Sequence, residues 1–210
     1  MPKLLCFDMD GVIFEPKNFW LELHKVFGTF DEGKKLTEKY LHSDYDALAK
    51  EVVGRLWKGK DAKLYYRLIK KTKYCSGVKE VFHEIKKRNY RTAIISSGSI
   101  DLARRAQHDL GIDFIFANEL VIKDGKVSGQ FKGPMGKGGI KKVQVIQQLC
   151  HNLKIGAKEI TYVGDSDTDL EAFRFVGKSI AFNSTSEKLN KIATHIVEGK
   201  DLRGILDFIS

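Results

Sequence analysis

Short apolar runs alternate with longer amphipathic stretches through most of the chain. Six runs of five or six residues are rich in β-branched or aromatic side chains, as expected of buried strands: 3–7, 91–96, 113–117, 159–163, 179–183 and 194–198. The stretches between them, such as 77–88, 100–110 and 140–153, carry apolar residues at helical spacing. This alternation is typical of βαβ units. The sequence therefore predicts an α/β fold with a Rossmann-like parallel sheet and helices on both faces.

Two segments depart from this alternation. Residues 119–131 alternate apolar and polar positions around Asp124-Gly125, which predicts a β-hairpin. Residues 15–73 contain no convincing strand and carry apolar residues at helical spacing. We therefore expect a core formed by 1–14 and 74–210 and a small helical cap formed by 15–73. An insertion after the first strand would overhang the carboxyl ends of the strands, where open α/β sheets bind ligands.

Composition narrows the class of protein. The chain has 210 residues, of which 42% are hydrophobic and 30% charged, as in ordinary soluble globular proteins. Its net charge of +9 comes from lysines scattered along the sequence, so a solvated surface is expected and a nucleic-acid partner is not. The three cysteines show no metal-ligand spacing, and no run approaches the roughly 20 apolar residues of a membrane span. We expect a cytoplasmic protein with no membrane partner.

Four polar motifs follow predicted strands or open the helices after them. They are Asp8-Met9-Asp10-Gly11, Ser96-Ser97-Gly98, Lys141-Lys142 and Asp165-Ser166-Asp167-Thr168-Asp169. Each alone has an ordinary explanation as a turn, a helix cap or a solvated lysine pair. In a parallel sheet, however, the carboxyl ends of the strands meet at one crevice. Together the four motifs therefore predict a ligand site.

The same motifs predict what that site binds. Four aspartates would crowd like charge into the crevice: Asp8, Asp10, Asp165 and Asp169. A hard cation would neutralise them, and Mg²⁺ suits a site with few carboxylates, a backbone oxygen, water and a phosphate oxygen. A lysine and a serine in the same crevice add donors for the other phosphate oxygens. The sequence thus predicts a small phosphorylated substrate and Mg²⁺ as cofactor.

In order and character, the four motifs resemble those of the haloacid-dehalogenase-like phosphohydrolases. The segments "GVKEVFHEIKKRNYRTAIISSG", "LGIDFIFANELVIKDGKVSG" and "VGDSDTDLEAF" are similar to those of the phosphoserine-phosphatase branch, as is the closing "ATHIVEGKDLRGILDFI". The resemblance covers 1–14 and 77–210. It implies a phosphatase, because dehalogenases of the family lack the Asp two residues after the nucleophile and phosphorylating ATPases have Thr there.

The resemblance also implies a role for each residue. Asp8 would be the nucleophile that forms an aspartyl-phosphate, and Asp10 the general acid and then the base, with its backbone carbonyl on Mg²⁺. Asp165 would ligate the metal together with Asp8, and Asp169 would support it. The phosphoryl group would be held by Ser96, an amide of Ser97 or Gly98, and Lys142. We prefer Lys142 to Lys141 and Lys137 because its 23-residue spacing to Asp165 fits the family.

The predicted cap is where the sequence departs from the phosphoserine-phosphatase pattern. That branch has Glu nine residues after the nucleophile to bind the substrate's amino group, whereas this chain has Lys17. Its substrate carboxylate is bound by a cap arginine, for which the nearest candidate is Arg55, offset by about one helical turn.

Three functions stay open at this point. The first is a Mg²⁺-dependent phosphatase for a small metabolite, with phosphoserine as the first candidate. The second is a phosphatase for a sugar phosphate, a nucleotide or a nucleic-acid end, which the missing Glu and the basic charge favour. The third is a non-catalytic module that binds a phosphorylated ligand, although no catalytic motif is damaged. The sequence does not indicate an oligomeric state.

Overall fold

A seven-stranded sheet organises the fold of the computed structural model, which describes residues 3–41, 43–133 and 139–209. The strand order is β4-β3-β2-β1-β5-β6-β7, and all neighbours are parallel except the antiparallel pair β3 and β4. The strands are β1 (Leu4–Phe7), β2 (Arg91–Ser99), β3 (Phe114–Lys123), β4 (Lys126–Lys132), β5 (Ile160–Gly164), β6 (Lys178–Phe182) and β7 (His195–Val197).

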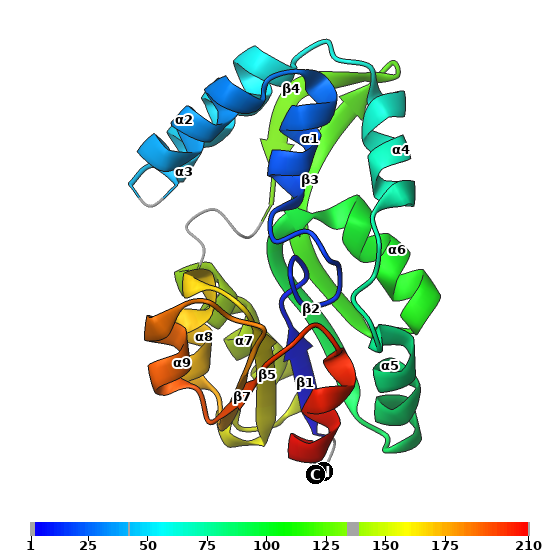
Figure 1. Cartoon of the computed structure of the whole chain (residues 1–210), viewed down its shortest axis with the longest axis vertical. Helices are drawn as coiled ribbons and strands as arrows, with labels where there is room; N and C mark the ends of the chain where they lie inside the picture. The colour runs from blue at the N-terminus through cyan, green and yellow to red at the C-terminus, as the bar shows by residue number, and fades with distance from the viewer. Residues whose placement is uncertain (1–2, 42, 134–138, 210) are drawn as a thin grey trace.

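Helices cover both faces of the sheet (Figure 1). The helices α5 (Val78–Lys87) and α6 (Ile100–Leu110) pack on one face, and α7 (Gly139–Leu153), α8 (Leu170–Phe175) and α9 (Glu187–Ile192) on the other. Short helical turns are η2 (Ala157–Glu159), η3 (Asp167–Asp169) and η4 (Leu202–Phe208). Strand β1 is buried throughout, with Leu5 and Phe7 in one core and Leu4 and Cys6 in the other. Burial on both faces explains its uninterrupted apolar run, and the predicted α/β fold is confirmed.

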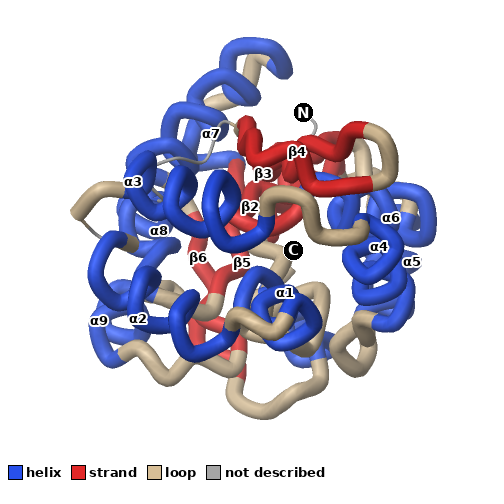
Figure 2. Tube along the Cα trace, turned by 90° about the horizontal axis from the view of Figure 1, so that it is seen from above, coloured by secondary structure: helices blue, strands red, loops and turns tan. Residues whose placement is uncertain are grey.

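Between β1 and α5 the chain is helical. It forms α1 (Phe19–Phe27), α2 (Phe30–Tyr40), α3 (Tyr45–Ala49), the π-helical segment η1 (Lys50–Trp57) and α4 (Ala62–Lys71). The Asn18 side chain accepts a hydrogen bond from the Leu21 amide, which begins α1, and Gly28 ends that helix with a φ of 68°. Seen from above, these helices lie in front of the strands (Figure 2). Within the described ranges, no helix is long and apolar enough to cross a membrane.

The predicted hairpin supports this helical region. The expected strand 113–117 and the hairpin 119–131 are one feature, because β3 continues without a break to a turn at Asp124 and Gly125, both with positive φ. At the far end of the hairpin, the Gly59 amide donates to the Val127 carbonyl at 2.8 Å, and the Val127 amide donates to the Lys60 carbonyl at 2.9 Å. The hairpin therefore fixes the helices to the sheet by backbone hydrogen bonds.

Candidate active site

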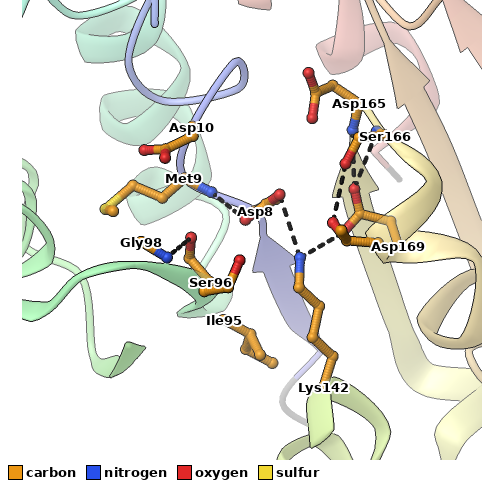
Figure 3. A network of polar contacts seen from close by, with 12 residues as sticks. Asp8, Met9, Asp10, Ile95, Ser96, Gly98, Lys142, Asp165, Ser166 and Asp169 are labelled. Carbon is orange, nitrogen blue, oxygen red and sulfur yellow. Dashed lines mark hydrogen bonds and ion pairs between the residues drawn. The ribbon is translucent and has the colours of Figure 1, made fainter. Parts of the chain in front are cut away.

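Three neighbouring parallel strands bring the polar motifs together. Asp8 directly follows β1, and its backbone amide donates to the Val163 carbonyl of β5 at 2.9 Å. Asp165 directly follows β5, and Ser96 lies in β2 on the other side of β1. Figure 3 shows the side chains converging, with Lys142 reaching them from α7. The convergence expected from strand ends in one sheet is present.

Lys142 is the central cation of this group. Its side chain is fully buried, and its Nζ lies 3.2 Å from Asp8 Oδ2 and 2.6 Å from Asp169 Oδ1. Burial alone would lower the pKa of Lys142, but the carboxylates of Asp169 and Asp8 raise it well above its usual range. Burial raises the pKa of Asp8, and the ammonium of Lys142 opposes that rise. Lys142 therefore remains charged beside Asp8.

The neighbouring lysines behave differently. Lys141 is exposed, in keeping with the preference for Lys142, whereas Lys137 lies outside the described residues. Adjacent helical positions point about 100° apart, so only one lysine of the pair can enter the site.

Asp169 holds the site together through all its acceptor positions. Its Oδ1 accepts from Lys142 and from the Tyr162 hydroxyl at 3.2 Å, and its Oδ2 accepts from the backbone amides of Asp165 and Ser166. The Tyr162 hydroxyl also contacts the Ile95 carbonyl at 3.1 Å. Sequence reasoning missed Tyr162, because it reads as one more apolar position of a buried strand. Asp169 thus acts as a support rather than a free ligand.

The acidic cluster fits a hard cation. Asp8, Asp165 and Asp169 are buried, and each offers an oxygen within 4.8 Å of those of the others. Burial raises the pKa of Asp165 to about 8, with further contributions from Asp8 and Asp169. Such crowding is relieved when a divalent cation binds carboxylate oxygens. Because Asp169 is already saturated with donors, Asp8 and Asp165 are the side chains suited to contact an ion.

A glycine makes room for this cluster. Gly11 has a φ of 77°, and a Cβ there would lie 2.4 Å from Asp165 Oδ2. A side chain at this position would be strained and would also displace Asp165. The residue type is therefore fixed by its neighbour as well as by the turn.

Asp10 lies on the side of Asp8 that is away from Asp165 and Asp169 (Figure 3), and its environment differs from that of these two carboxylates. Its Oδ2 accepts from the Phe19 amide at 2.8 Å, whereas its buried Oδ1 has no hydrogen-bond partner among the described residues. Burial raises the pKa of Asp10 to about 7. A carboxyl group with one anchored oxygen and one unpaired oxygen is suited to exchange a proton with a bound molecule.

Ser96, Ser97 and Gly98 form a bend in the edge of β2 that faces Asp10. The Ser96 hydroxyl accepts from the Gly98 amide at 3.0 Å, and the pairing of β2 with β3 is irregular between Ile95 and Ser99. A Cβ on Gly98 would lie 2.6 Å from Met9 Cε and 3.3 Å from the Asp10 carboxylate oxygens. The glycine therefore allows β2 to approach Asp10 closely.

A cavity of about 270 Å³ opens above these residues. Asp8, Asp10 and Asp165 line its floor together with Ser96 and Ser97. The opposite wall belongs to the helical region and β4 and is largely apolar, including Trp20, Leu41, Tyr45, Val53, Trp57 and Phe131. The rings of Tyr45 and Phe131 were not predicted to line the cavity, because their segments are far apart in the sequence and meet only through the hairpin.

Two charged residues of the helical region lie in different places. Lys17 lines the cavity, with its Nζ 4.0 Å from Asp165 Oδ2 and donating to the Asn183 carbonyl at 3.3 Å. Arg55 is not among the residues that line the cavity, and its side chain is half exposed. Its guanidinium contacts Glu32 at 2.6 Å and Glu51 at 2.7 Å. The structure therefore does not bring Arg55 to the site for which it was predicted.

Asp167, the middle aspartate of its motif, contacts a different element. Its exposed side chain accepts a hydrogen bond from the hydroxyl of Ser186, the N-cap residue of α9, and takes no part in the site. Asp167 thus links η3 to α9, away from the acidic cluster.

Known proteins share this fold and sequence pattern. The family model of haloacid dehalogenase-like hydrolases matches residues 2–177. A phosphoserine phosphatase of Archaeoglobus fulgidus is 30% identical over 97% of the chain, which spans 58% of that relative's length. One of Methanocaldococcus jannaschii is 29% identical over 99% of the chain and 97% of its own length.

Solved structures agree with these matches. A substrate-bound phosphoserine phosphatase complex superposes with a TM-score of 0.89 at 27% identity, covering 100% of this chain and 99% of the other. A phospho-aspartyl intermediate analogue of phosphoserine phosphatase gives 0.88 at 28% identity with the same coverage. The chain therefore belongs to the haloacid dehalogenase-like hydrolases, in their phosphoserine-phosphatase-like branch.

Proposed function

We propose that the protein hydrolyses phosphate monoesters through an aspartyl-phosphate on Asp8. The observation that carries this proposal is the pairing of Asp8 with the fully buried Lys142, beside a second carboxyl group, Asp10, whose Oδ1 is buried and unpaired. One carboxylate is thus held beside a permanent cation, and the other is left available for a proton. Splitting hydrolysis into two displacements is what such a pair can do.

In the first displacement, an Asp8 oxygen attacks phosphorus and the bond from phosphorus to the ester oxygen breaks. Asp10, protonated at this stage, gives its proton to the departing alkoxide. In the second displacement, Asp10 takes a proton from a water molecule as that water attacks the phosphorus of the aspartyl-phosphate. Inorganic phosphate leaves, and both Asp8 and Asp10 return to their starting states.

The remaining residues of the site bind and orient the phosphoryl group. Lys142 offsets negative charge on Asp8 and on the phosphoryl oxygens, which is where phosphoryl transfer needs most help. The Ser96 hydroxyl and an amide of Ser97 or Gly98 would hold two further oxygens. Ser96 and Ser97 line the cavity together with Asp8, and the Ser96 hydroxyl, which accepts from the Gly98 amide, keeps its own proton to donate.

We propose Mg²⁺ as the cofactor. Asp8, Asp165 and the backbone carbonyl of Asp10 would hold it, with Asp169 supporting Asp165 and Lys142. When bound, the ion would neutralise the carboxylates and polarise a phosphoryl oxygen. The oxygen-only donor set supports a hard cation over a transition metal.

We further propose that residues 15–73 act as a cap over the site. Relatives named phosphoserine phosphatase make phosphoserine the first substrate to test. Lys17, in place of the acidic residue expected for an amino group, supports a second candidate class: a sugar phosphate, a nucleotide or a nucleic-acid end. The three cysteines are free, which fits a reducing compartment, and a cytoplasmic location stays a prediction.

Release of inorganic phosphate tests the proposed function. The native protein should release phosphate from at least one monoester in Mg²⁺ and none in EDTA, and Asp8→Asn should abolish release. Asp167→Asn is the matched control, because it makes the same change in an exposed carboxylate away from the acidic cluster. Equal rates for the native protein and Asp8→Asn would exclude Asp8 as the nucleophile.

A further inference from the structure

The two walls of the cavity differ in kind. Its floor is made of the catalytic carboxylates and serines, whereas rings from four separate elements gather on the opposite wall. Trp20 of α1 lies edge-on to Phe131 of β4 with ring centres 5.6 Å apart, and Tyr45 of α3 lies 6.3 Å from the same phenyl ring. Trp57 lies behind them, 5.9 Å from Trp20.

Three polar groups on the ring-lined wall are already engaged within the protein. Trp20 Nε1 donates to the Ser97 carbonyl at 2.9 Å, and the Tyr45 hydroxyl accepts from the Asn118 side-chain amide at 3.0 Å. The Thr37 hydroxyl donates to the Gly33 carbonyl at 2.8 Å. A substrate facing this wall would meet mainly ring faces and aliphatic groups.

The histidine ring of the helical wall is also neutral. Trp57 Nε1 donates to His24 Nδ1 at 3.2 Å, and the Thr29 hydroxyl lies 2.8 Å from the same nitrogen. Burial lowers the pKa of His24 to about 4. His24 therefore contributes no charge to the cavity near neutral pH.

The described part of this wall offers no charge that could bind an amino-acid leaving group. Among the described residues that line the cavity, the helical region contributes one charged side chain, Lys17, and it is directed to the floor beside Asp165. Arg55 is held outside by Glu32 and Glu51. An ammonium and a carboxylate buried against rings would lose their hydration without gaining partners.

On the basis of the proposed function, we infer that the protein acts on phosphate monoesters whose alcohol portion is apolar and about the size of one aromatic ring. The phosphoryl group would lie on the floor, and the apolar portion would pack against the cavity side of Trp20, Tyr45 and Phe131. The volume agrees with this assignment, because an apolar cavity of about 150 Å³ suffices for benzene. The remaining space of the 270 Å³ cavity suits a phosphoryl group.

Three substrates test this inference: 2-phenylethyl phosphate, ethyl phosphate and phosphoserine, each with Mg²⁺. The two alkyl esters release alkoxides of similar basicity, so the ratio of their kcat/KM values reports binding of the ring. We expect 2-phenylethyl phosphate to exceed both others by at least about tenfold, since a ring is worth more than the single methylene that gives such a factor. A preference for phosphoserine over 2-phenylethyl phosphate would overturn the inference.

A pair of variants locates the effect. Phe131→Ala should reduce the ratio of 2-phenylethyl to ethyl phosphate turnover by at least about threefold, because it removes one face of the ring site. Phe30→Ala is the matched control, since Phe30 lies at the start of α2 and does not line the cavity. A ratio that falls equally in both variants would contradict the ring site.

Binding of non-hydrolysable phosphonates separates this inference from the proposed function. In calorimetry with Mg²⁺, 2-phenylethylphosphonate should bind at least about tenfold more tightly than ethylphosphonate. That difference would support the ring site even if no ester were hydrolysed, a result that would contradict the proposed function alone. Equal affinities would overturn the ring site whatever the hydrolysis assay gives.

Discussion

The floor and the ring-lined wall of the cavity are built in different ways. On the floor, Asp8 and Asp165 each follow a buried strand, so the hydrogen-bonded register of the sheet sets their positions. The wall is assembled from α1, α3, η1 and β4, whose rings meet only by packing. Backbone register tolerates little variation, whereas packed rings can be exchanged at modest cost. The floor therefore fixes the chemistry, and the wall is free to change the substrate.

The largest effect on activity should come from removing Lys142, the buried cation that contacts Asp8 of the floor. Lys142→Met leaves Asp8 and Asp169 without their shared partner, and kcat should fall by about 10³-fold, as for other groups that stabilise transition-state charge. Lys141→Met makes the same change at the adjacent, exposed position and should keep kcat within about twofold, as expected for a solvated side chain. Phosphate release under saturating substrate measures both.

Thermal unfolding of the two variants tests whether a loss of activity comes only from a loss of folded protein. Loss of Lys142 also leaves two buried carboxylates unpaired, which is destabilising. If Lys142→Met melts like the native protein and still turns over at the native rate, the assignment of Lys142 to the floor is wrong.

On the ring-lined wall, we expect His24 to make the unfolding free energy of the protein depend on pH. His24 has an ordinary pKa of about 6.5 when unfolded and a folded pKa of about 4, so the folded state disfavours the proton. The resulting stabilisation is complete well above pH 6.5 and is lost as the pH falls towards 4, by about 3 kcal/mol in unfolding free energy. Urea unfolding at pH 7, 5.5 and 4.5 measures the loss.

Variants isolate His24 from other acid-sensitive groups. His24→Asn keeps an acceptor for Trp57 and removes the titration, so its unfolding free energy should fall less between pH 7 and pH 4.5 than that of the native protein. His151→Asn changes an exposed histidine of α7 and should leave the native pH dependence intact. If His24→Asn and the native protein lose the same stability, His24 is not buried in its neutral form.

A smaller effect is expected at Gly11, where the position of Asp165 depends on the absence of a side chain. Gly11→Ala would place a Cβ 2.4 Å from Asp165 Oδ2 and should raise the Mg²⁺ concentration for half-maximal activity by about tenfold, as displaced ligand supports do elsewhere. Gly199→Ala is the matched control, because Gly199 has a φ of 89° with nothing within 4 Å of a Cβ. Both variants introduce backbone strain, but only Gly11→Ala would displace Asp165. Titration of activity with Mg²⁺ therefore separates the two causes, because only displacement of Asp165 should raise the Mg²⁺ requirement.

Sequence periodicity predicted the floor better than the wall for a physical reason. A strand followed by Asp places that Asp at the sheet edge wherever the strand pairs, so Asp8 and Asp165 could be placed from local pattern alone. The extension of β2 to Ser99 and the union of two expected segments in β3 were missed, because pairing with neighbours overrides local propensity. Arg55 was misplaced because helix rotation depends on the packing of α2 against η1.

Two residues have roles in the site that could not be assigned from the sequence. Tyr162 is an apolar strand residue by pattern, and only the fold shows its hydroxyl on Asp169. Phe131 reads as the end of a hairpin, and only the fixing of that hairpin to residues 59–62 shows that its ring faces the cavity. Both roles arise from contacts between segments distant in sequence, which no local pattern encodes.

The smallest effect should come from Lys17, a residue of the helical region whose charge lies beside a carboxylate of the floor. Its ammonium lies 4.0 Å from Asp165 Oδ2, and its side chain is 51% exposed. There it competes with a bound cation for the same carboxylate, so Lys17→Met should tighten Mg²⁺ binding by about threefold, a change equivalent to the 0.2–1 kcal/mol typical of exposed ion pairs. Calorimetric titration at about 0.05 M and 0.5 M salt should show the difference shrinking as screening increases.

Lys25→Met is the matched control. It removes an exposed lysine that is paired with Glu22 on α1, and it should leave Mg²⁺ affinity unchanged at both salt concentrations. Weaker Mg²⁺ binding in Lys17→Met would mean that Lys17 supports the floor rather than competing there. Its position would then be set by the cation site instead of by the substrate.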